Sequence, residues 1–312
     1  MTAYIVRRLW QMLPTMLGVV LLVFFLFNWV GGDPAYVLAG KISNQEQIDN
    51  IRRQLGVDQP YWVQLGIFLK QIVTADFGAS WSTNERVSHI LLTRLGPSLT
   101  VLVPLLILST LISIGLALAV AYVRGSLTDR MVMIVCTVGL SISILVYIIV
   151  FQYVFAYKLG WFPVQGWGNG FWENLITYAR LPILIGLVVS IAPNLRLYRT
   201  FFLDEINQDY VRTARAKGLS ENRIMWIHVL RNASIPIITF LMAELPGLLL
   251  GSFLIERFFS IPGIGREVIL AVERSDFPVI KALTVYVAFA TVASNLLADL
   301  MYKAADPRVQ LK

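Results

Sequence analysis

Few residues in this chain are of a type, and in a place, that could do chemistry. Glu244 is the clearest of them, because it lies near the centre of an apolar segment, in the stretch Met242-Ala-Glu244-Leu-Pro246. A carboxylate at that depth in a membrane is costly and normally faces other protein or a water-filled path. The sequence leaves two roles open for Glu244: it lines a translocation path, or it holds helices together as a protonated or hydrogen-bonded group.

Other reactive residue types occur without the neighbours that their chemistry needs. His89 and His228 each lack a second metal ligand at helical spacing, so both are expected to be solvated or interfacial. The single Gly-Lys pair, Gly40-Lys41, has Ala35 and Ile42 where a phosphate-binding loop needs a glycine and a Ser or Thr. No Ser/His/Asp or Cys/His arrangement stands out for nucleophilic catalysis. We therefore expect no catalytic residue, no metal site and no cofactor bound by this chain.

A polar island at residues 204–231 separates two apolar segments and has the pattern helix, glycine turn, helix. Gly218 stands where a helix end often needs a left-handed backbone, and Ser220 is placed to cap the helix that follows. A rigid helical projection would transmit a displacement, whereas an ordinary basic loop beside the membrane would contact anionic lipid. Its apolar residues recur at helical spacing, at Val211, Ala214, Leu219, Ile224, Ile227 and Leu230.

The elements that must position these residues are membrane-spanning helices. The 312 residues are 57% hydrophobic and 14% charged, with a mean hydropathy of +0.68, which leaves too little polar surface for a soluble globule. The net charge of +7 is dispersed over segment ends rather than gathered in a basic stripe, so nucleic acid is not expected as a partner. Apolar runs of about 20 residues predict an all-α integral membrane protein with six spans, at about 9–30, 98–123, 131–157, 181–200, 235–255 and 281–302.

The placement of Lys and Arg predicts that both termini are cytoplasmic. Basic residues mark the two ends of the chain, a short turn between the second and third spans, and the 204–231 island. The long segment 31–97 then becomes a small extracytoplasmic insertion. Within it, residues 48–55 predict one amphipathic helix and residues 61–69 a second, more apolar helix.

The Pro/Gly-rich turn that follows the fifth span lies at the outer mouth of the protein in this topology. Pro262, Gly263 and Gly265 are candidate contacts there, either for an extracytoplasmic partner protein or within a gate. The alternative is a re-entrant turn that only tethers the last helix. Both roles stay open on the sequence.

The polar island resembles the cytoplasmic EAA loop of ABC-transporter permease subunits, and the likeness extends along the chain. The whole sequence is similar to dipeptide and oligopeptide ABC permeases of the B-subunit type. The island departs from the general pattern, since Arg212-Thr213-Ala214 replaces Glu-Ala-Ala and Leu230-Arg231 replaces a final Leu-Pro. The likeness is carried by short motifs whose order and spacing are together specific, namely Arg7-Arg8-Leu9, Gly32-Asp33-Pro34-Ala35, Leu55-Gly-Val-Asp-Gln-Pro60, Asp76-Phe-Gly78 with Ser80, Phe258-Phe-Ser-Ile-Pro-Gly-Ile-Gly265, Ser275-Asp-Phe-Pro278 and Ala305-Asp-Pro-Arg308.

The resemblance implies that residues 1–312 form one permease domain with the type I ABC importer fold, in a bacterial cytoplasmic (inner) membrane. The implied substrates are di- and oligopeptides. The implied partners are a homologous second permease, two ATPase subunits that bind ATP and Mg²⁺, an extracytoplasmic peptide-binding protein and membrane lipid, so that the chain itself is no enzyme. The island would dock on an ATPase through Tyr210, Arg212, Thr213, Ala214, Lys217, Gly218, Leu219 and Ser220.

Two alternatives to peptide import remain. Within the same family, an importer of nickel or another small solute stays open, because a separate binding protein would set most of the specificity. A proton-coupled secondary transporter would use Glu244 as a proton carrier and the island as a mere linker; inverted repeats and several intramembrane carboxylates would mark that class. The sequence has one central carboxylate and no evident repeat, which disfavours this second alternative.

Overall fold

The computed structural model describes residues 2–30, 33–39 and 44–305, and in these ranges the chain is helical apart from turns and one isolated β-bridge, Ala79 to Arg86. The all-α fold class predicted from the sequence is therefore confirmed. The N-terminal half contains α1 (Thr2–Phe25), η1 (Leu26–Val30, where η marks a π-helical segment), α2 (Pro34–Ala39), α3 (Gln45–Leu55), α4 (Tyr61–Thr74), α5 (Val87–Tyr122), α6 (Leu127–Ser141), α7 (Ile144–Phe151) and η2 (Gln152–Lys158). The C-terminal half contains α8 (Phe171–Glu173), η3 (Asn174–Tyr178), α9 (Arg180–Ile206), α10 (Asp209–Ala216), α11 (Glu221–Arg223), η4 (Ile224–Val229), α12 (Leu230–Leu250), α13 (Phe253–Phe258), α14 (Ile264–Glu273) and α15 (Phe277–Ala305).

Some sequence features singled out above fall outside the described residues. They are Gly32, the Gly40-Lys41 pair with Ile42, and the Asp306-Pro-Arg308 end of the last motif. The other motifs lie in the described part of the chain, so their surroundings can be compared with the expectations.

Within the described residues, five helical stretches are long and apolar enough to cross a membrane, and a bent helix pair makes six if it counts as one span. This agrees with the expected multi-pass protein. The α5 helix begins at Val87, well before the expected start near residue 98, and it continues through Pro97 and Pro104. The five stretches are Trp10–Trp29, Val87–Tyr122, Arg180–Ile206, Glu221–Phe258 and Phe277–Leu297.

The span expected at 131–157 is broken by a bend in the structure, because α6 and α7 meet there at 90°. Ile142 is extended, with ψ at 128°, and Ser143 starts α7 as its N-cap, its hydroxyl accepting the Leu145 N–H across 3.4 Å. Serine stabilises a new helix start even inside an apolar run. Hydropathy counts apolar residues but does not register a change of direction.

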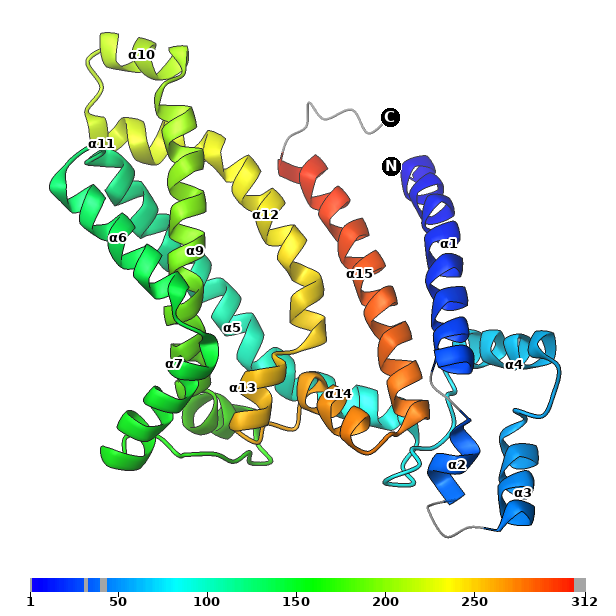
Figure 1. Ribbon diagram of the computed structural model, residues 1–312. Helices are drawn as coiled ribbons and strands as arrows, with labels where there is room; N and C mark the ends of the chain where they lie inside the picture. Colours follow the sequence, from blue (N-terminus) through cyan, green and yellow to red (C-terminus); the bar gives the residue numbers. More distant parts are fainter. Residues whose placement is uncertain (1, 31–32, 40–43, 306–312) are drawn as a thin grey trace.

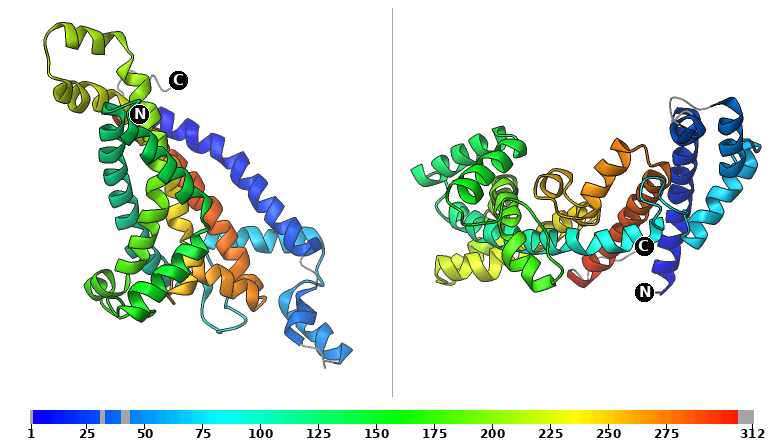
Figure 2. Two further views of the ribbon diagram at one scale, coloured as in Figure 1. Left: turned by 60° about the vertical axis from the view of Figure 1, so that its left-hand side comes forward. Right: turned by 90° about the horizontal axis from the view of Figure 1, so that it is seen from below.

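The helices form an open bundle (Figures 1 and 2). The α5 and α9 helices pack against each other at its centre, α12 lies beside α15, and α1 packs along the outer edge of α15. The start of α1, the end of α15 and the α10–α11 segment lie at one end of the molecule, which we call the inner side. The helices α3, α13 and α14 lie at the opposite end, the outer side.

The segment between α1 and α5 contains both helices that the sequence predicts for it. Asn44 and Gln47 form a capping box at the start of α3, and Gly56 ends the helix in a left-handed conformation, with φ at +68°. The Arg52 Nε donates to Asp33 Oδ2 across 2.5 Å, which ties α3 to the residue before α2. The α4 helix lies across the outer end of α1 (Figure 1).

Candidate functional site

The helical projection on the inner side, residues 209–223, is the first candidate site, and we call it the knob. A glycine turn joins α10 to α11, as the sequence predicts, and Gly218 has a φ of +74°. The Gly218 N–H donates to the Arg215 carbonyl at 2.9 Å, and the Leu219 N–H donates to the Ala214 carbonyl at 3.3 Å. A left-handed residue is what this helix end requires. A Cβ at Gly218 would meet nothing within 4 Å, so the need for glycine is conformational and not steric.

One face of the knob is packed into the inner end of the bundle. Val211 and Ala214 of α10 are buried and α10 packs on η4, in the same apolar core as Tyr198 and Phe202 of α9. Both residues belong to the apolar set that recurs at helical spacing in the sequence. Ile227 belongs to the same set but is 48% exposed, and it lies in the π-helical segment 224–229, whose phase differs from that of an α-helix. The knob is therefore attached to η4, which contacts α9 and continues into α12.

Polar contacts add to this attachment. The Tyr210 hydroxyl donates to Glu205 Oε2 across 2.5 Å, and burial together with this carboxylate raises the pKa of Tyr210 to about 12. Across the turn, the Arg215 guanidinium makes two bonds to the Glu221 carboxylate, at 2.7 and 3.2 Å, and this pairing raises the pKa of Arg215. Both partners of that pair are partly exposed, so it contributes about 0.2–1 kcal/mol.

The eight residues expected to dock on an ATPase divide between the two faces of the knob. Ala214 is buried, and Tyr210 and Leu219 are half-buried, so these three hold the knob in place. Ser220 occupies the N-cap position of α11, but its side chain makes no cap hydrogen bond, contrary to the expectation; Glu221 beside it pairs with Arg215 instead. The outward face consists of Arg212, Thr213, Lys217, Gly218 and Ser220, all exposed.

Glu244, the second candidate, lines a cavity of about 340 Å³ between α5, α9 and α12. Ser109, Ser190 and Asn194 supply further polar groups to this cavity, and the remaining lining is largely leucine. Glu244 has neither a hydrogen bond nor an ion pair with any of the described residues. Its side chain is thus not used to hold two helices together in this conformation.

The third candidate, the turn at Pro262, Gly263 and Gly265, surrounds a buried carboxylate on the outer side. Glu256 of α13 is 1% exposed. Its Oε1 accepts from Ser98 Oγ of α5 at 2.8 Å and from the Ser252 N–H at 3.0 Å. Its Oε2 accepts from the Arg266 N–H of α14 at 3.0 Å. A carboxylate at the start of α14 is also favoured by the helix dipole.

The two glycines of this turn leave the space that the carboxylate fills. Both are buried, and a Cβ on Gly263 would overlap the Glu256 carboxylate and the Ser98 hydroxyl. A Cβ on Gly265 would lie 2.8 Å from the Phe253 nitrogen and 3.1 Å from Glu256 Oε2. Pro262 is half-buried and lines a separate cavity of about 280 Å³. In this conformation, then, Gly263 and Gly265 face inward and pack the joint between α5, α13 and α14.

A second buried carboxylate, Asp276, lies at the other end of α14. Its oxygens accept from Ser80 Oγ at 2.5 Å, from Ser82 Oγ at 2.8 Å, and from the backbone N–H groups of Trp81 and Ser82, each at 3.1 Å. Burial alone would raise the pKa of Asp276, but these hydrogen bonds outweigh it and hold the pKa below its ordinary value. Both ends of α14 are therefore fixed by carboxylates, one to α5 and one to the loop before α5.

Sequence reasoning missed the roles of these residues. Ser80 and Asp276 belong to motifs that carry the family resemblance, but neither was given a contact, and Glu256 and Ser98 were not singled out. The available signal was chemical: Glu256 and Asp276 are acids next to apolar segments and Pro/Gly-rich turns, where an unpaired charge would be costly. Partners 158 and 196 positions away in the chain are not indicated by any local pattern.

Comparisons with known proteins agree with this architecture along the whole chain. Residues 111–311 match the family described as binding-protein-dependent transport system inner membrane component, and residues 1–102 match its N-terminal membrane component. The chain is 34% identical over 313 residues to the glutathione transport system permease protein GsiC of Salmonella typhimurium, covering 100% of both chains. It is 36% identical over 315 residues to a putative peptide transport system permease protein of Brucella abortus strain 2308, covering 99% of both. The resemblance to ABC permeases of peptide importers is confirmed, and the chain belongs to the family of membrane permease components of binding-protein-dependent transport systems.

Proposed function

We propose that this chain is one of two permease subunits in an ATP-driven importer of short peptides. The observation that carries the proposal is the knob: a rigid helix–turn–helix, packed into the bundle on one face and presenting exposed polar residues on the other. Full-length similarity to relatives named as glutathione and peptide transport permeases supports peptides as the substrate class. Glutathione is itself a tripeptide, so both names describe the same chemical class.

The subunit that hydrolyses ATP must be a different one, because this chain has no sequence motif for binding ATP. The sequence has no phosphate-binding loop, and we propose that two partner ATPase subunits bind ATP and Mg²⁺. One of them docks on the exposed knob residues, namely Arg212, Thr213, Lys217, Gly218 and Ser220. A homologous second permease completes the translocation path, and an extracytoplasmic binding protein delivers the peptide to the outer side. In this arrangement the inner side of the bundle is cytoplasmic, in the inner membrane of a bacterium.

The path itself passes Glu244 in this proposal. A carboxylate that has no partner among the described residues, in a cavity with Ser109, Ser190 and Asn194, can attract the amino terminus of a peptide. On the outer side, the glycine turn and α14 act as part of the gate. Because α14 is fixed at both ends, it moves together with the start of α5 and not as a free loop.

Transport by the reconstituted complex tests the proposal. The permease pair and its ATPases are placed in proteoliposomes with ATP inside and binding protein outside, and uptake of labelled peptides is measured. Peptide uptake that requires ATP supports the proposal. Uptake of Ni²⁺ or another small solute in place of peptide, by a complex with the same ATP requirement, would show that the substrate class is wrong while the machinery is right.

A further inference from the structure

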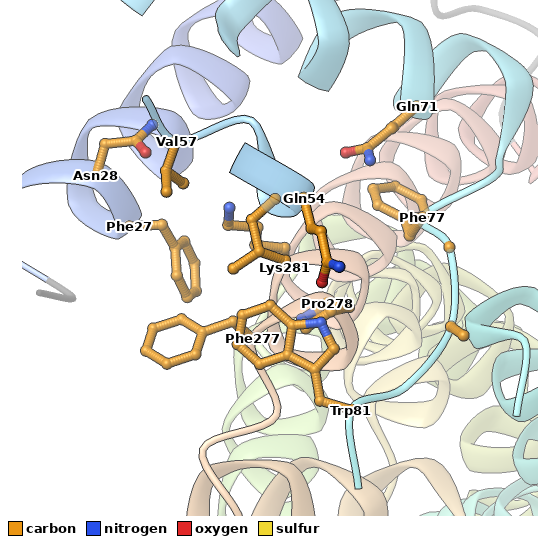
Figure 3. A pocket seen from close by; sticks show the side chains of 13 residues that line it. Phe27, Asn28, Gln54, Val57, Gln71, Phe77, Trp81, Phe277, Pro278 and Lys281 are labelled. Atoms are coloured by element: carbon orange, nitrogen blue, oxygen red, sulfur yellow. The ribbon is translucent and has the colours of Figure 1, made fainter. Parts of the chain in front are cut away.

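A cavity of about 270 Å³ lies on the outer side, where η1, the α3–α4 insertion and the start of α15 meet (Figure 3). Aromatic rings form much of its wall, contributed by Phe27, Phe77, Trp81 and Phe277. Three side-chain amides also line it, those of Asn28, Gln54 and Gln71. Lys281 carries the single charge among its lining residues, and none of the lining residues is acidic. The cavity therefore has largely aromatic walls, three amide groups and one positive charge.

In the part of the chain that the structure describes, no acidic side chain neutralises the charge of Lys281. It is half-buried, and its ammonium lies 5.6 Å from the centre of the Phe27 ring, but it makes no hydrogen bond or ion pair with the described residues. A cation–π contact offsets only part of the cost of burying this charge. An anion placed beside Lys281 would therefore be favourable.

Hydrogen-bond donors for such an anion are at hand. The side-chain amides of Gln54 and Gln71 make no hydrogen bond with the described part of the chain, and each can donate two. Asn28 uses one amide hydrogen for the Phe24 carbonyl, at 3.0 Å, and keeps the second. Figure 3 shows these side chains, together with Lys281, arranged around the same space. One cation and several amide donors are the groups with which proteins hold a phosphate.

The surroundings place this cavity at the level of lipid headgroups. Trp29, at the end of the first span, is 75% exposed, and Trp62 of α4 is 77% exposed. Exposed tryptophans next to the end of a span are typical of the membrane interface. A smaller hollow of about 100 Å³ shares Asn28, Gln71 and Lys281 with the cavity and is lined further by Gln64, Ile67 and Phe68 of α4. A polar site beside interfacial tryptophans and apolar side chains suits a lipid better than a free anion.

We propose that this cavity binds the phosphate group of an anionic phospholipid. Lys281 provides the charge, Asn28, Gln54 and Gln71 provide hydrogen bonds, and Ile67 and Phe68 of α4 contact the start of an acyl chain. The bound lipid joins the insertion to α1 and α15, three elements that otherwise meet around an unneutralised lysine. Since Phe277 follows Asp276 directly and Lys281 lies one helical turn further on, the lipid also stiffens the junction that holds α14.

The test measures lipid binding by the full chain, purified in detergent with its partner subunits. The probes are dihexanoyl-phosphatidylglycerol, the zwitterionic dihexanoyl-phosphatidylcholine, and inorganic phosphate. We expect the wild type to prefer phosphatidylglycerol, and Lys281→Gln to weaken that binding by about tenfold, while Lys281→Arg keeps most of it. Lys70→Gln is the matched control, because Lys70 is an exposed lysine of α4 that lines neither cavity, and its loss should leave binding unchanged.

Gln71→Leu is the second variant, which keeps the charge and removes one donor, and it should also weaken phosphatidylglycerol binding. This variant keeps the test decisive if Lys281→Gln does not fold. Equal phosphatidylglycerol affinities for the wild type, Lys281→Gln and Gln71→Leu would overturn the proposal. Displacement of the lipid by an equal concentration of inorganic phosphate would overturn the lipid as the ligand and identify a free-anion site.

Discussion

The Ser98 hydroxyl donates a hydrogen bond to Glu256 Oε1 at 2.8 Å and accepts one from the Ile264 N–H at the same distance, in the buried joint between α5, α13 and α14. The Ser98 side chain thus forms hydrogen bonds with a buried carboxylate and with the first N–H group of a helix. Because Ser98 and Glu256 are 158 positions apart, this contact fixes the outer ends of two separate spans to each other. It makes α14 and the start of α5 one mechanical unit.

Ser98→Ala should destabilise the protein by about 1–3 kcal/mol, because it leaves Glu256 Oε1 with one donor fewer and the buried Ile264 N–H without its acceptor. The measurement is thermal or denaturant unfolding of the purified chain in detergent. Ser141→Ala is the matched control, since the Ser141 hydroxyl is exposed and bonds only within its own helix, to the Thr137 carbonyl. Equal losses of stability in the two variants would contradict the role given to Ser98.

Asp276 gives a pH-dependent prediction. Its pKa is lower in the folded protein than the ordinary value of 3.8, so the folded state favours the ionised form. The stability that this carboxylate contributes is therefore fully present above about pH 4 and is lost as the pH falls through the lowered pKa. Asp276→Asn should unfold more easily than the wild type at pH 7, and the difference should shrink below about pH 4. A difference between the two that does not change with pH would contradict the assignment.

Gly218→Asp should abolish transport while leaving membrane insertion and folding intact. The left-handed backbone costs aspartate about 1 kcal/mol, and the position has open space, so the fold tolerates the change. The new charge lies on the exposed face that we propose docks on an ATPase.

Gly160→Asp is the control for Gly218→Asp. Gly160 also has a positive φ, +65°, and no neighbour within 4 Å, but it lies in the loop after η2, outside the knob. Both variants are reconstituted with the ATPases, and ATP-dependent uptake is measured. Normal transport by a fully assembled Gly218→Asp complex would contradict the proposed role of the knob, as would an equal loss in both variants.

Glu244→Gln tests the proposed path. The change keeps the size of the side chain and removes its charge, so uptake of peptides with a free amino terminus should fall by about tenfold, and uptake of their N-acetylated forms should fall much less. Ser190→Ala, in the wall of the same cavity, controls for a general effect on its shape. A uniform loss for both kinds of peptide would assign Glu244 to helix packing instead.

Local patterns in the sequence were enough to predict the helices and the knob. The left-handed conformation of Gly218 and the helical spacing of the buried Val211 and Ala214 could be predicted. Both features depend only on neighbours within a few residues. The 90° turn before Ile144 was missed, since Ser143 redirects the chain without changing its hydropathy. Ile227 shares the apolar spacing but is exposed, because the phase of a π-helical segment differs from that of an α-helix.

The outer joints could not be predicted, for a different reason. Glu256 accepts a hydrogen bond from Ser98, and Asp276 accepts one from Ser80, and both serines are distant in the chain. The residues next to a serine in the sequence do not indicate what its side chain will contact. Burial of a carboxylate requires partners, but only the packing of α14 against α5 determines which ones. Lys281 differs from these two carboxylates, because no acidic residue lines its cavity. The sequence alone gave no reason to single it out.

The most direct test of the central claim is uptake of labelled di- to penta-peptides into proteoliposomes that hold this chain, the second permease and both ATPases, with binding protein outside and ATP inside. The account predicts uptake that requires ATP, survives collapse of the proton gradient, and is lost in Gly218→Asp. Peptide uptake that ignores ATP and stops when the proton gradient collapses would contradict it, and would make Glu244 a proton carrier.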